Sequence, residues 1–330
     1  MTAPFGGPAT GRPDDAALVT VIGESLVDII ESGQVTGGQQ AHPGGSPLNV
    51  AVGCARLHMT TTLVTHFAED LHGQLIADHL RSNGVDTIVG GSSPTSTAAA
   101  FLDVTGAAKY RFSVSWDLNG AAIPALAAVQ GSRHVHTGSI AAILSPGNAA
   151  VRSLTDAALP HATVSFDPNC RPALSPDVAA ARRQVEEFVA ASDIVKASDE
   201  DLRWLYPDRS PEVSLVAWLE LGPALVALTR GAQGPVLLNR HGRVELPGET
   251  VDVADTVGAG DSFMAALISG LSQWGLLGAA RRLRLAALTP ADMRALAAYA
   301  NRAAAITCSR PGADPPGLAE LGALAPPLPA

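Results

Sequence analysis

Short apolar runs alternate with longer amphipathic stretches along most of this chain. Residues 18–22, Leu-Val-Thr-Val-Ile, are largely β-branched and end at Gly23, which predicts a buried strand. Similar patterns predict further strands at 61–67, 133–137, 163–166, 193–196 and 225–228, and helices at 47–57, 73–82 and 180–191. Because strands that alternate with helices favour crossover connections, we predict a three-layer α/β/α fold with a central, mostly parallel sheet covered on both faces.

A second pattern departs from this alternation. In residues 110–116, Tyr-Arg-Phe-Ser-Val-Ser-Trp, apolar and polar side chains alternate strictly, so one face of the strand is buried and the other is wet. Together with 98–104 and the Gly-rich 32–40, this segment predicts a small antiparallel sheet apart from the main one, a lid formed by about 32–43 and 96–116. The alternative is an edge hairpin of the main sheet. Another hairpin is predicted at 235–246, and a last amphipathic helix at about 291–307.

Composition and charge narrow the classes of protein. The chain has 330 residues, 47% of them hydrophobic and 16% charged, enough for a large core. Its formal net charge of −9 argues against nucleic acid or an anionic membrane as a partner. The three cysteines are far apart, which predicts neither disulfides nor a zinc site and favours the cytoplasm. We expect a flexible tail at 1–16, one domain at 17–330, and neither a signal peptide nor a membrane span.

The strongest chemical signal lies at residues 255–263, Asp-Thr-Val-Gly-Ala-Gly-Asp-Ser-Phe. Gly258, Ala259 and Gly260 are small enough for the backbone to approach a ligand, and their N–H groups would open the next helix as an anion site. Asp261 would lie in the first turn of that helix. A carboxylate beside a bound anion suits a base that takes a proton from a hydroxyl attacking phosphorus. The alternative is an N-capping aspartate after a glycine turn.

Two common nucleotide-binding motifs are absent from the sequence. There is no GxxxxGK[ST] loop, and only Gly23 follows the first strand, so a GxGxxG motif is missing as well. His134 and His136 would share one face of a strand, as metal ligands do, but no third ligand is placed by the sequence. We therefore expect structural roles for both histidines.

Two segments together resemble the ribokinase-like (PfkB) carbohydrate kinase family. The first is residues 43–51, Pro-Gly-Gly-Ser-Pro-Leu-Asn-Val-Ala, similar to the family's N-terminal Gly-Gly…Asn signature, and the second is residues 255–263. They occur in the family's order, and the resemblance extends from about residue 17 to 320. It implies the ribokinase-like fold with a β lid, which often pairs into a homodimer. It also implies ATP and Mg²⁺ as cofactors and a small sugar as the substrate.

The resemblance also assigns roles to residues of the catalytic and sugar sites. Asp261 matches the family's base, and the N–H groups of residues 258–260 match its anion hole. Asp28 matches a sugar-binding aspartate, because a carboxylate can accept hydrogen bonds from two neighbouring hydroxyls. Gly45 and Asn49 match the other sugar contacts.

Further residues match the family's nucleotide and ion sites. Thr229, Gly231 and Gly234 fall in a segment that resembles the nucleotide loop, and Asn301 and Gly312 fall where relatives line the adenine pocket. The family's Asn-x-x-Glu element, which holds Mg²⁺ through water, reads Ser198…Asp201 here, and both side chains are shorter. A K⁺ site that many relatives have would involve Asp255, Val257, Arg310 and Gly312, mostly through carbonyl oxygens.

Three segments favour fructose within the family: 23–28 (Gly-Glu-Ser-Leu-Val-Asp), 136–139 and 166–171 resemble fructokinases. Ser46 stands where ribokinases carry a lysine. Arg171 does not separate fructose from 2-keto-3-deoxygluconate, because the kinases of that acid share the segment and a guanidinium suits a carboxylate. A nucleoside (adenosine) kinase is another alternative, and a non-catalytic sugar-binding regulator is an alternative of a different class.

Overall fold

The structure is a computed structural model that describes residues 18–31, 39–102 and 108–325. The predicted tail at 1–16 lies outside these ranges. Most of the described strands belong to one nine-stranded sheet in the order β13-β12-β11-β10-β9-β8-β1-β4-β5. Along the sheet these strands are β13 (Gly242–Glu245), β12 (Val236–Asn239), β11 (Leu225–Thr229), β10 (Ile194–Ser198), β9 (Thr163–Asp167), β8 (His134–Gly138), β1 (Leu18–Ile22), β4 (Thr60–His66) and β5 (Asp86–Gly90).

The predicted mostly parallel sheet is confirmed. From β11 to β5 every neighbouring pair is parallel, and only the pairs β11–β12 and β12–β13 are antiparallel. In the centre, Val21 of β1 lies between Leu63 of β4 and His136 of β8. These central strands read as apolar runs because both faces of the sheet are covered.

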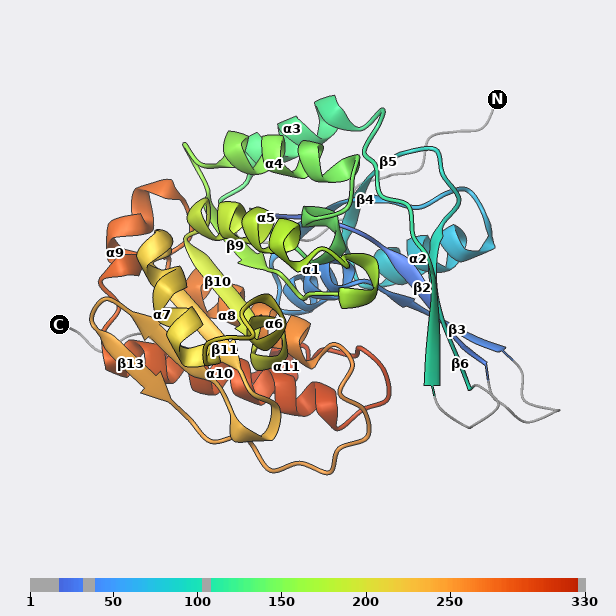
Figure 1. Cartoon of the computed structure of the whole chain (residues 1–330). Helices are drawn as coiled ribbons and strands as arrows, with labels where there is room; N and C mark the ends of the chain where they lie inside the picture. Colours follow the sequence, from blue (N-terminus) through green and yellow to red (C-terminus); the bar gives the residue numbers. More distant parts are fainter. Residues whose placement is uncertain (1–17, 32–38, 103–107, 326–330) are drawn as a thin grey trace.

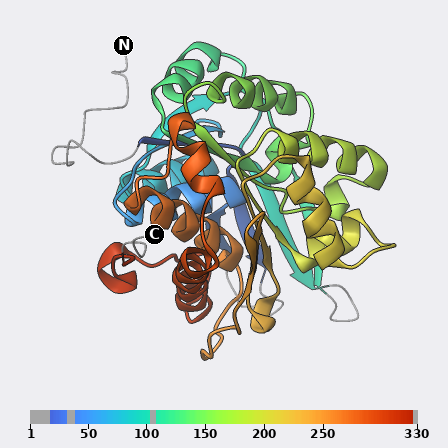
Figure 2. The same ribbon diagram turned by 90° about the vertical axis from the view of Figure 1, so that its left-hand side faces the viewer.

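Helices cover both faces of this sheet, so the three-layer prediction is also confirmed (Figures 1 and 2). One apolar core joins one face of the sheet to α1 (Ser46–Arg56), α2 (Leu71–Ser82), α8 (Ala259–Gln273), α9 (Arg282–Ala286), α10 (Pro290–Cys308) and α11 (Leu318–Leu321). The other core joins the opposite face to α3 (Ala122–Gly131), α4 (Gly147–Ala158), α5 (Val178–Ala190), α6 (Asp199–Leu205) and α7 (Pro211–Leu221). Short 3-10 turns lie at η1 (Ser139–Ala142), η2 (Pro172–Leu174), η3 (Gly231–Gln233) and η4 (Ala279–Arg281).

A separate four-stranded sheet, here called the lid, projects from the main body and is visible on the right of Figure 1. Its order is β3-β2-β6-β7, with β2 (Leu26–Glu31), β3 (Gln39–Gly44), β6 (Ser96–Leu102) and β7 (Ala108–Ser113). The sequence prediction of a separate small sheet is therefore right, but it omitted β2. It was also wrong to make the sheet fully antiparallel, because β2 pairs with β6 in parallel. Residues 32–38 and 103–107 of the predicted lid lie outside the described ranges.

Two helices that carry the sequence motifs lie side by side. A Cβ atom on Gly53 of α1 would lie 2.6 Å from the Cβ of Ala265 in α8, so the missing side chain allows the helices to approach closely. This approach brings the 43–51 and 255–263 motifs together, although they are far apart in the sequence. No helix in the described ranges is long and apolar enough to span a bilayer.

Candidate active site

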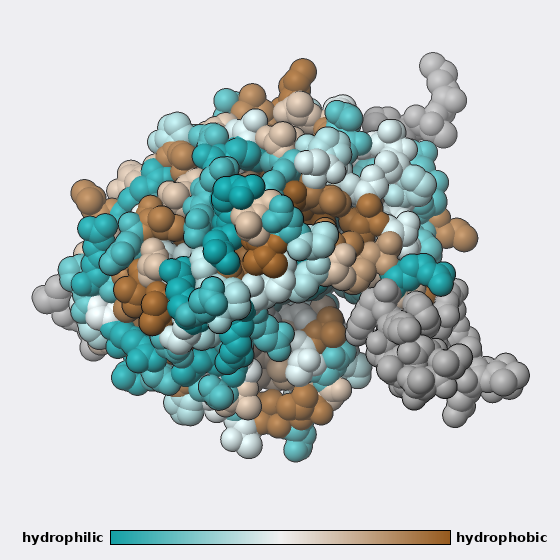
Figure 3. Space-filling view, viewed as in Figure 1, coloured by the Kyte–Doolittle hydropathy of each residue, from teal (hydrophilic) through white to brown (hydrophobic). Residues whose placement is uncertain are grey.

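A cleft of about 850 Å³ opens between the lid and the carboxyl ends of the main-sheet strands. Figure 3 shows the surface hollowed between the main body and the lid. Ligands in open α/β sheets bind at this edge, where the strands end and loops diverge. Most of the predicted site residues line the cleft: Asp28, Gly45, Asn49, Arg171, Asp201, Thr229, Gly231, Gly234, Val257, Gly258, Ala259, Gly260, Asp261 and Asn301.

Asp261 lies in the first turn of α8 and is held from α1. Ser46 Oγ donates to its Oδ1 at 2.6 Å, and Asn49 Nδ2 donates to its Oδ2 at 2.8 Å. The residue is only 8% exposed, yet it lines the cleft. Each oxygen has one protein donor and keeps a lone pair free, so the carboxylate is fixed in orientation but can still accept a proton. The sequence motifs assigned no role to the Ser46 hydroxyl.

The turn before α8 presents backbone N–H groups without acceptors. Gly258 has a φ of 76°, and a Cβ there would lie 2.6 Å from that of Ala313, so both conformation and space require glycine. The helix has no side-chain cap, and the N–H groups of Gly258, Gly260 and Asp261 donate to no acceptor among the described residues. The Ala259 N–H makes only a long bond, 3.3 Å, to the Thr256 carbonyl. Free N–H groups at a helix start form an anion site.

Asp28 occupies the lid side of the cleft on β2, the strand that follows β1. Burial raises the pKa of its carboxyl, and the positive charges of Arg171 and His42 oppose that rise. A Cβ on Gly44 would lie 2.2 Å from Asp28 Oδ2, so the neighbouring strand β3 needs a glycine to leave room for this carboxylate.

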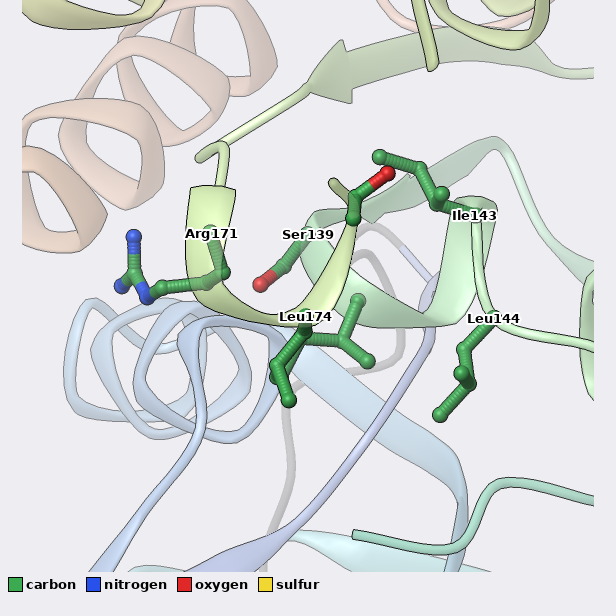
Figure 4. A pocket seen from close by; sticks show the side chains of 7 residues that line it. Ser139, Ile143, Leu144, Arg171 and Leu174 are labelled. Atoms are coloured by element: carbon green, nitrogen blue, oxygen red, sulfur yellow. The ribbon is translucent and has the colours of Figure 1, made fainter. Parts of the chain in front are cut away.

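Arg171 lies between the cleft and a much smaller pocket of about 10 Å³, which has room for about one water molecule. Its Nη1 donates to Asn169 Oδ1 at 2.6 Å and to the carbonyl oxygens of Asn169 and Cys170, each at 3.1 Å. Figure 4 shows the guanidinium directed away from Ile143 and Leu144, which line the small pocket. The guanidinium therefore lies away from the apolar side chains of the small pocket.

Glu24 is a cleft residue that sequence reasoning did not select. It follows β1, is 1% exposed, and accepts a hydrogen bond from the Ala141 N–H at 3.0 Å through Oε2. Burial raises the pKa of the carboxyl to about 7, although hydrogen bonds from Ser139 and Ala141 oppose this. The available signal was a charged residue two positions after the end of a buried strand.

The other end of the cleft is formed by the predicted nucleotide loop. Thr229, Gly231 and Gly234 line it together with Asn301, whose Nδ2 donates to the Pro247 carbonyl at 3.0 Å. Gly312 does not line the cleft, in contrast to the sequence expectation. Its N–H instead donates a hydrogen bond to Asp255 Oδ2 at 2.9 Å.

The residues expected around K⁺ come together only in part. Asp255 accepts hydrogen bonds from the N–H groups of Val257, at 3.1 Å, and Gly312, so the two loops lie side by side. These bonds lower the pKa of the Asp255 carboxyl, although burial acts against them. The Arg310 guanidinium is paired instead with Asp314 and Glu320. In the described ranges, no group of three or more His, Cys, Asp and Glu side chains is placed to hold a metal ion.

Asp201 has a structural partner for each carboxylate oxygen. Oδ1 accepts from the Cys170 N–H at 2.6 Å, while Oδ2 accepts from the N–H and the hydroxyl of Ser198 at 2.8 and 2.6 Å. Ser198 and Asp201 thus form the capping box of α6, which explains the Ser-x-x-Asp pattern. Glu200 also lines the cleft, and its side chain makes no hydrogen bond to another described residue.

The two histidines that share a face of β8 are buried and have structural partners, as expected. His134 is within hydrogen-bond distance of Thr163 and Ser165, and His136 Nδ1 is 2.8 Å from the same Ser165 hydroxyl. Burial lowers the pKa of each to about 3, so both rings are neutral.

Comparison with known proteins agrees with the class that this architecture defines. Residues 16–319 match the pfkB family of carbohydrate kinases. Fructokinase from Rhizobium leguminosarum bv. trifolii is 32% identical over 79% of this chain and 81% of its own. The structure of a fructokinase from Xylella fastidiosa with bound ATP has a TM-score of 0.81 at 23% identity, covering 92% and 97% of the two chains. A fructokinase from Vibrio cholerae with fructose, ADP and calcium has a TM-score of 0.72 at 26% identity, covering 91% and 95%.

The fold is thus that of the ribokinase-like kinases, and the predicted fold class is confirmed. The chain belongs to the pfkB family of carbohydrate kinases, so it is a phosphotransferase with an alcohol acceptor. The expected similarity to fructokinases is confirmed as well.

Proposed function

We propose that this protein is a fructokinase that transfers the γ-phosphoryl group of ATP to a hydroxyl of fructose. The observation that carries the proposal is Asp261, held by Ser46 and Asn49 at the cleft, next to unpaired N–H groups at the start of its own helix, α8. The carboxylate removes the proton of the sugar hydroxyl, and the N–H groups stabilise the charge on the phosphoryl group. Because both are fixed before the reaction, little reorganisation is needed.

The nucleotide would occupy the end of the cleft lined by Thr229, Gly231, Gly234 and Asn301, with its phosphates directed to the start of α8. The volume of about 850 Å³ is sufficient for a nucleotide and a monosaccharide together. Val251 and Val253 add apolar surface to this end. A solved structure of the same fold contains bound ATP, which supports ATP as the nucleotide.

A magnesium ion would neutralise phosphate charge, and carboxylates are its preferred protein ligands. Asp201 is used as a helix cap, so we assign the contact with the hydrated ion to Glu200, which lines the cleft. The K⁺ site around Asp255 and Val257, the homodimer through the lid and the cytoplasmic location remain predictions.

The sugar would lie between the lid and the ends of β1 and β8, near Asp28, Glu24 and Asn49. The Arg171 charge acts on both acids and lowers their pKa values against the effect of burial. A neutral polyol can accept and donate hydrogen bonds among these groups, whereas a substrate carboxylate would face two acids competing for one arginine. This arrangement favours fructose over 2-keto-3-deoxygluconate.

A nucleoside acceptor is less well supported. Phe112 and Phe263 are the aromatic residues in the cleft lining, and Phe263 is only 1% exposed. The side pocket beside Arg171 holds about 10 Å³, far too little for a base. The regulator alternative is disfavoured because a binding protein does not need a base next to an anion site.

The test is ADP release with ATP and Mg²⁺ in the presence of fructose, 2-keto-3-deoxygluconate, ribose or adenosine. Fructose should support turnover, and Asp261→Asn should lower kcat by about 10²–10⁴-fold while fructose still binds in calorimetry. Asp156→Asn, which changes an exposed ion pair with Arg152 on α4, is the matched control and should be fully active. Near-normal turnover of the Asp261 variant would disprove the assignment of the base. Turnover only with another acceptor would replace the sugar.

A further inference from the structure

A buried ion pair lies at the floor of the cleft. Lys196 of β10 and Asp167, the last residue of β9, are joined by an Nζ–Oδ2 distance of 2.8 Å, and their side chains are 5% and 1% exposed. Lys196 nevertheless lines the cleft. None of the sequence motifs gives this pair a role.

Stability alone is a weak reason for such a pair, because well-packed apolar side chains of similar size often do as well or better. The lysine remains a cation in spite of its position. Burial lowers the pKa of its amine, but the negative charges of Asp167, Asp201 and Asp261 outweigh burial and raise it. The fold thus holds a positive charge at a fixed place that water barely reaches.

The place of this charge is informative. A Cβ atom on Gly260 would lie 2.9 Å from Lys196 Nζ, so the cation lies directly against the turn whose N–H groups are free. The ammonium group has three N–H donors. The group forms an ion pair with Asp167, and no residue of the described ranges accepts a hydrogen bond from it. Buried donors without acceptors at the edge of an anion site indicate an anionic ligand.

We propose that Lys196 is a catalytic residue whose free N–H donors contact an oxygen of the phosphoryl group during transfer, and that Asp167 is its positioning residue. The inference rests on the proposed kinase function. In the step, the sugar oxygen bonds to the γ-phosphorus as the bond to the bridging oxygen of ATP breaks. The electron pair leaves with ADP, the sugar proton goes to Asp261, and Lys196 keeps its proton. The lysine stabilises the charge that Asp261 and the N–H groups alone would only partly balance.

The test removes both charges at once, because a single change would leave the other charge buried and unpaired. Lys196→Met combined with Asp167→Asn should lower kcat by about 10²–10³-fold, the usual loss for one donor to a developing oxyanion. The fructose Kd from calorimetry should stay within about threefold of the wild-type value, since the pair is expected to act on the phosphoryl group and not on the sugar. A purely structural pair would alter Tm and leave kcat intact.

The matched control is another ion pair, Arg282 of α9 with Asp193, the residue before β10, at 2.7 Å, which does not line the cleft. Arg282→Met with Asp193→Asn should lower Tm but keep kcat within about twofold. If the Lys196 double variant is insoluble, Lys196→Arg is measured alone; it keeps a cation beside Asp167 but moves its donors, and it should lower kcat at least about tenfold.

If the wild-type protein turns over and the Lys196 variants keep a normal kcat, the role of Lys196 is overturned and the kinase function stands. Absence of turnover in the wild-type protein with every sugar would overturn the function itself and the inference with it. The two failures are therefore distinguishable in one set of assays.

Discussion

Glu24 gives the protein an unusual dependence of stability on pH. Burial raises the pKa of its carboxyl from 4.5 to about 7, so between these values the folded state binds one proton more than the unfolded state. The free energy of unfolding therefore falls as pH rises through this window and is flat above it. The rise in pKa from 4.5 to about 7 corresponds to a loss of about 3 kcal/mol in the free energy of unfolding across this window, at about 1.36 kcal/mol per pH unit.

Replacement of Glu24 by Gln removes this titration. The amide oxygen of glutamine can still accept from the Ala141 N–H, which Glu24 contacts at 3.0 Å, so most of the local hydrogen bonding is kept. The variant should match the wild-type protein near pH 5 and exceed it by about 1–3 kcal/mol at pH 8. A gain in stability at the expense of fructose binding is expected for a charge buried in a binding site.

Urea unfolding at pH 5, 6, 7 and 8 measures this difference. The titration of other groups in the window, such as Asp167 with its pKa raised by burial to about 6, occurs in both proteins and cancels from the difference. The m-values should agree, which would show that the same surface unfolds. A difference between variant and wild-type protein that stays constant from pH 5 to pH 8 would refute the reasoning.

Two other predictions concern the geometry around Asp261. Asn49→Ala removes the 2.8 Å hydrogen bond to Oδ2, so the carboxylate loses one of its two anchors. In the ADP-release assay, kcat should fall about tenfold with little change in the KM for ATP. A rise in the KM for ATP as large as the fall in kcat would contradict a role in orientation. Gly258→Ala places a side chain at a φ of 76° and against Ala313. The free energy of unfolding should fall by about 1–3 kcal/mol, with a lower Tm, and the affinity for ATP in calorimetry should fall as well. An unchanged affinity for ATP would show that the turn is not part of the nucleotide site.

The main sheet was predictable from the sequence because its strands are continuous apolar runs. Residues 18–22 and 225–228 became buried strands at the expected places, since a strand with two covered faces needs little more than apolar side chains. The lid was harder. Strand β2 follows β1 after only three residues and pairs with β6 in parallel, a long-range contact that no local pattern reveals.

Parts of the site were predictable for a different reason. The glycines of the 255–263 segment and Asp261 are recognisable because the chemistry requires small residues and an acid next to each other in the sequence. Ser46, Glu24 and Lys196 gave no such signal. Each contacts a residue distant in the sequence that only the folded chain brings near. Ser46 contacts Asp261, Glu24 contacts Ala141, and Lys196 contacts Asp167.

The division of charge along the cleft explains how an acidic protein can take an anionic nucleotide. The net charge of −9 is spread over the whole chain, but a ligand responds to the charges that face it. Glu24 and Asp28 gather at the sugar end, where a neutral polyol offers hydroxyls to both. Lys196 and the free N–H groups of the 258–261 turn gather where the phosphates would lie, with Arg230 at the nucleotide loop. Asp261, the proposed base, also lines the cleft and stands at the boundary between the two ends. Exchanging the two ends would set carboxylates against the phosphates and repel the nucleotide, so the placement of these few charges, and not the total, decides what the cleft accepts.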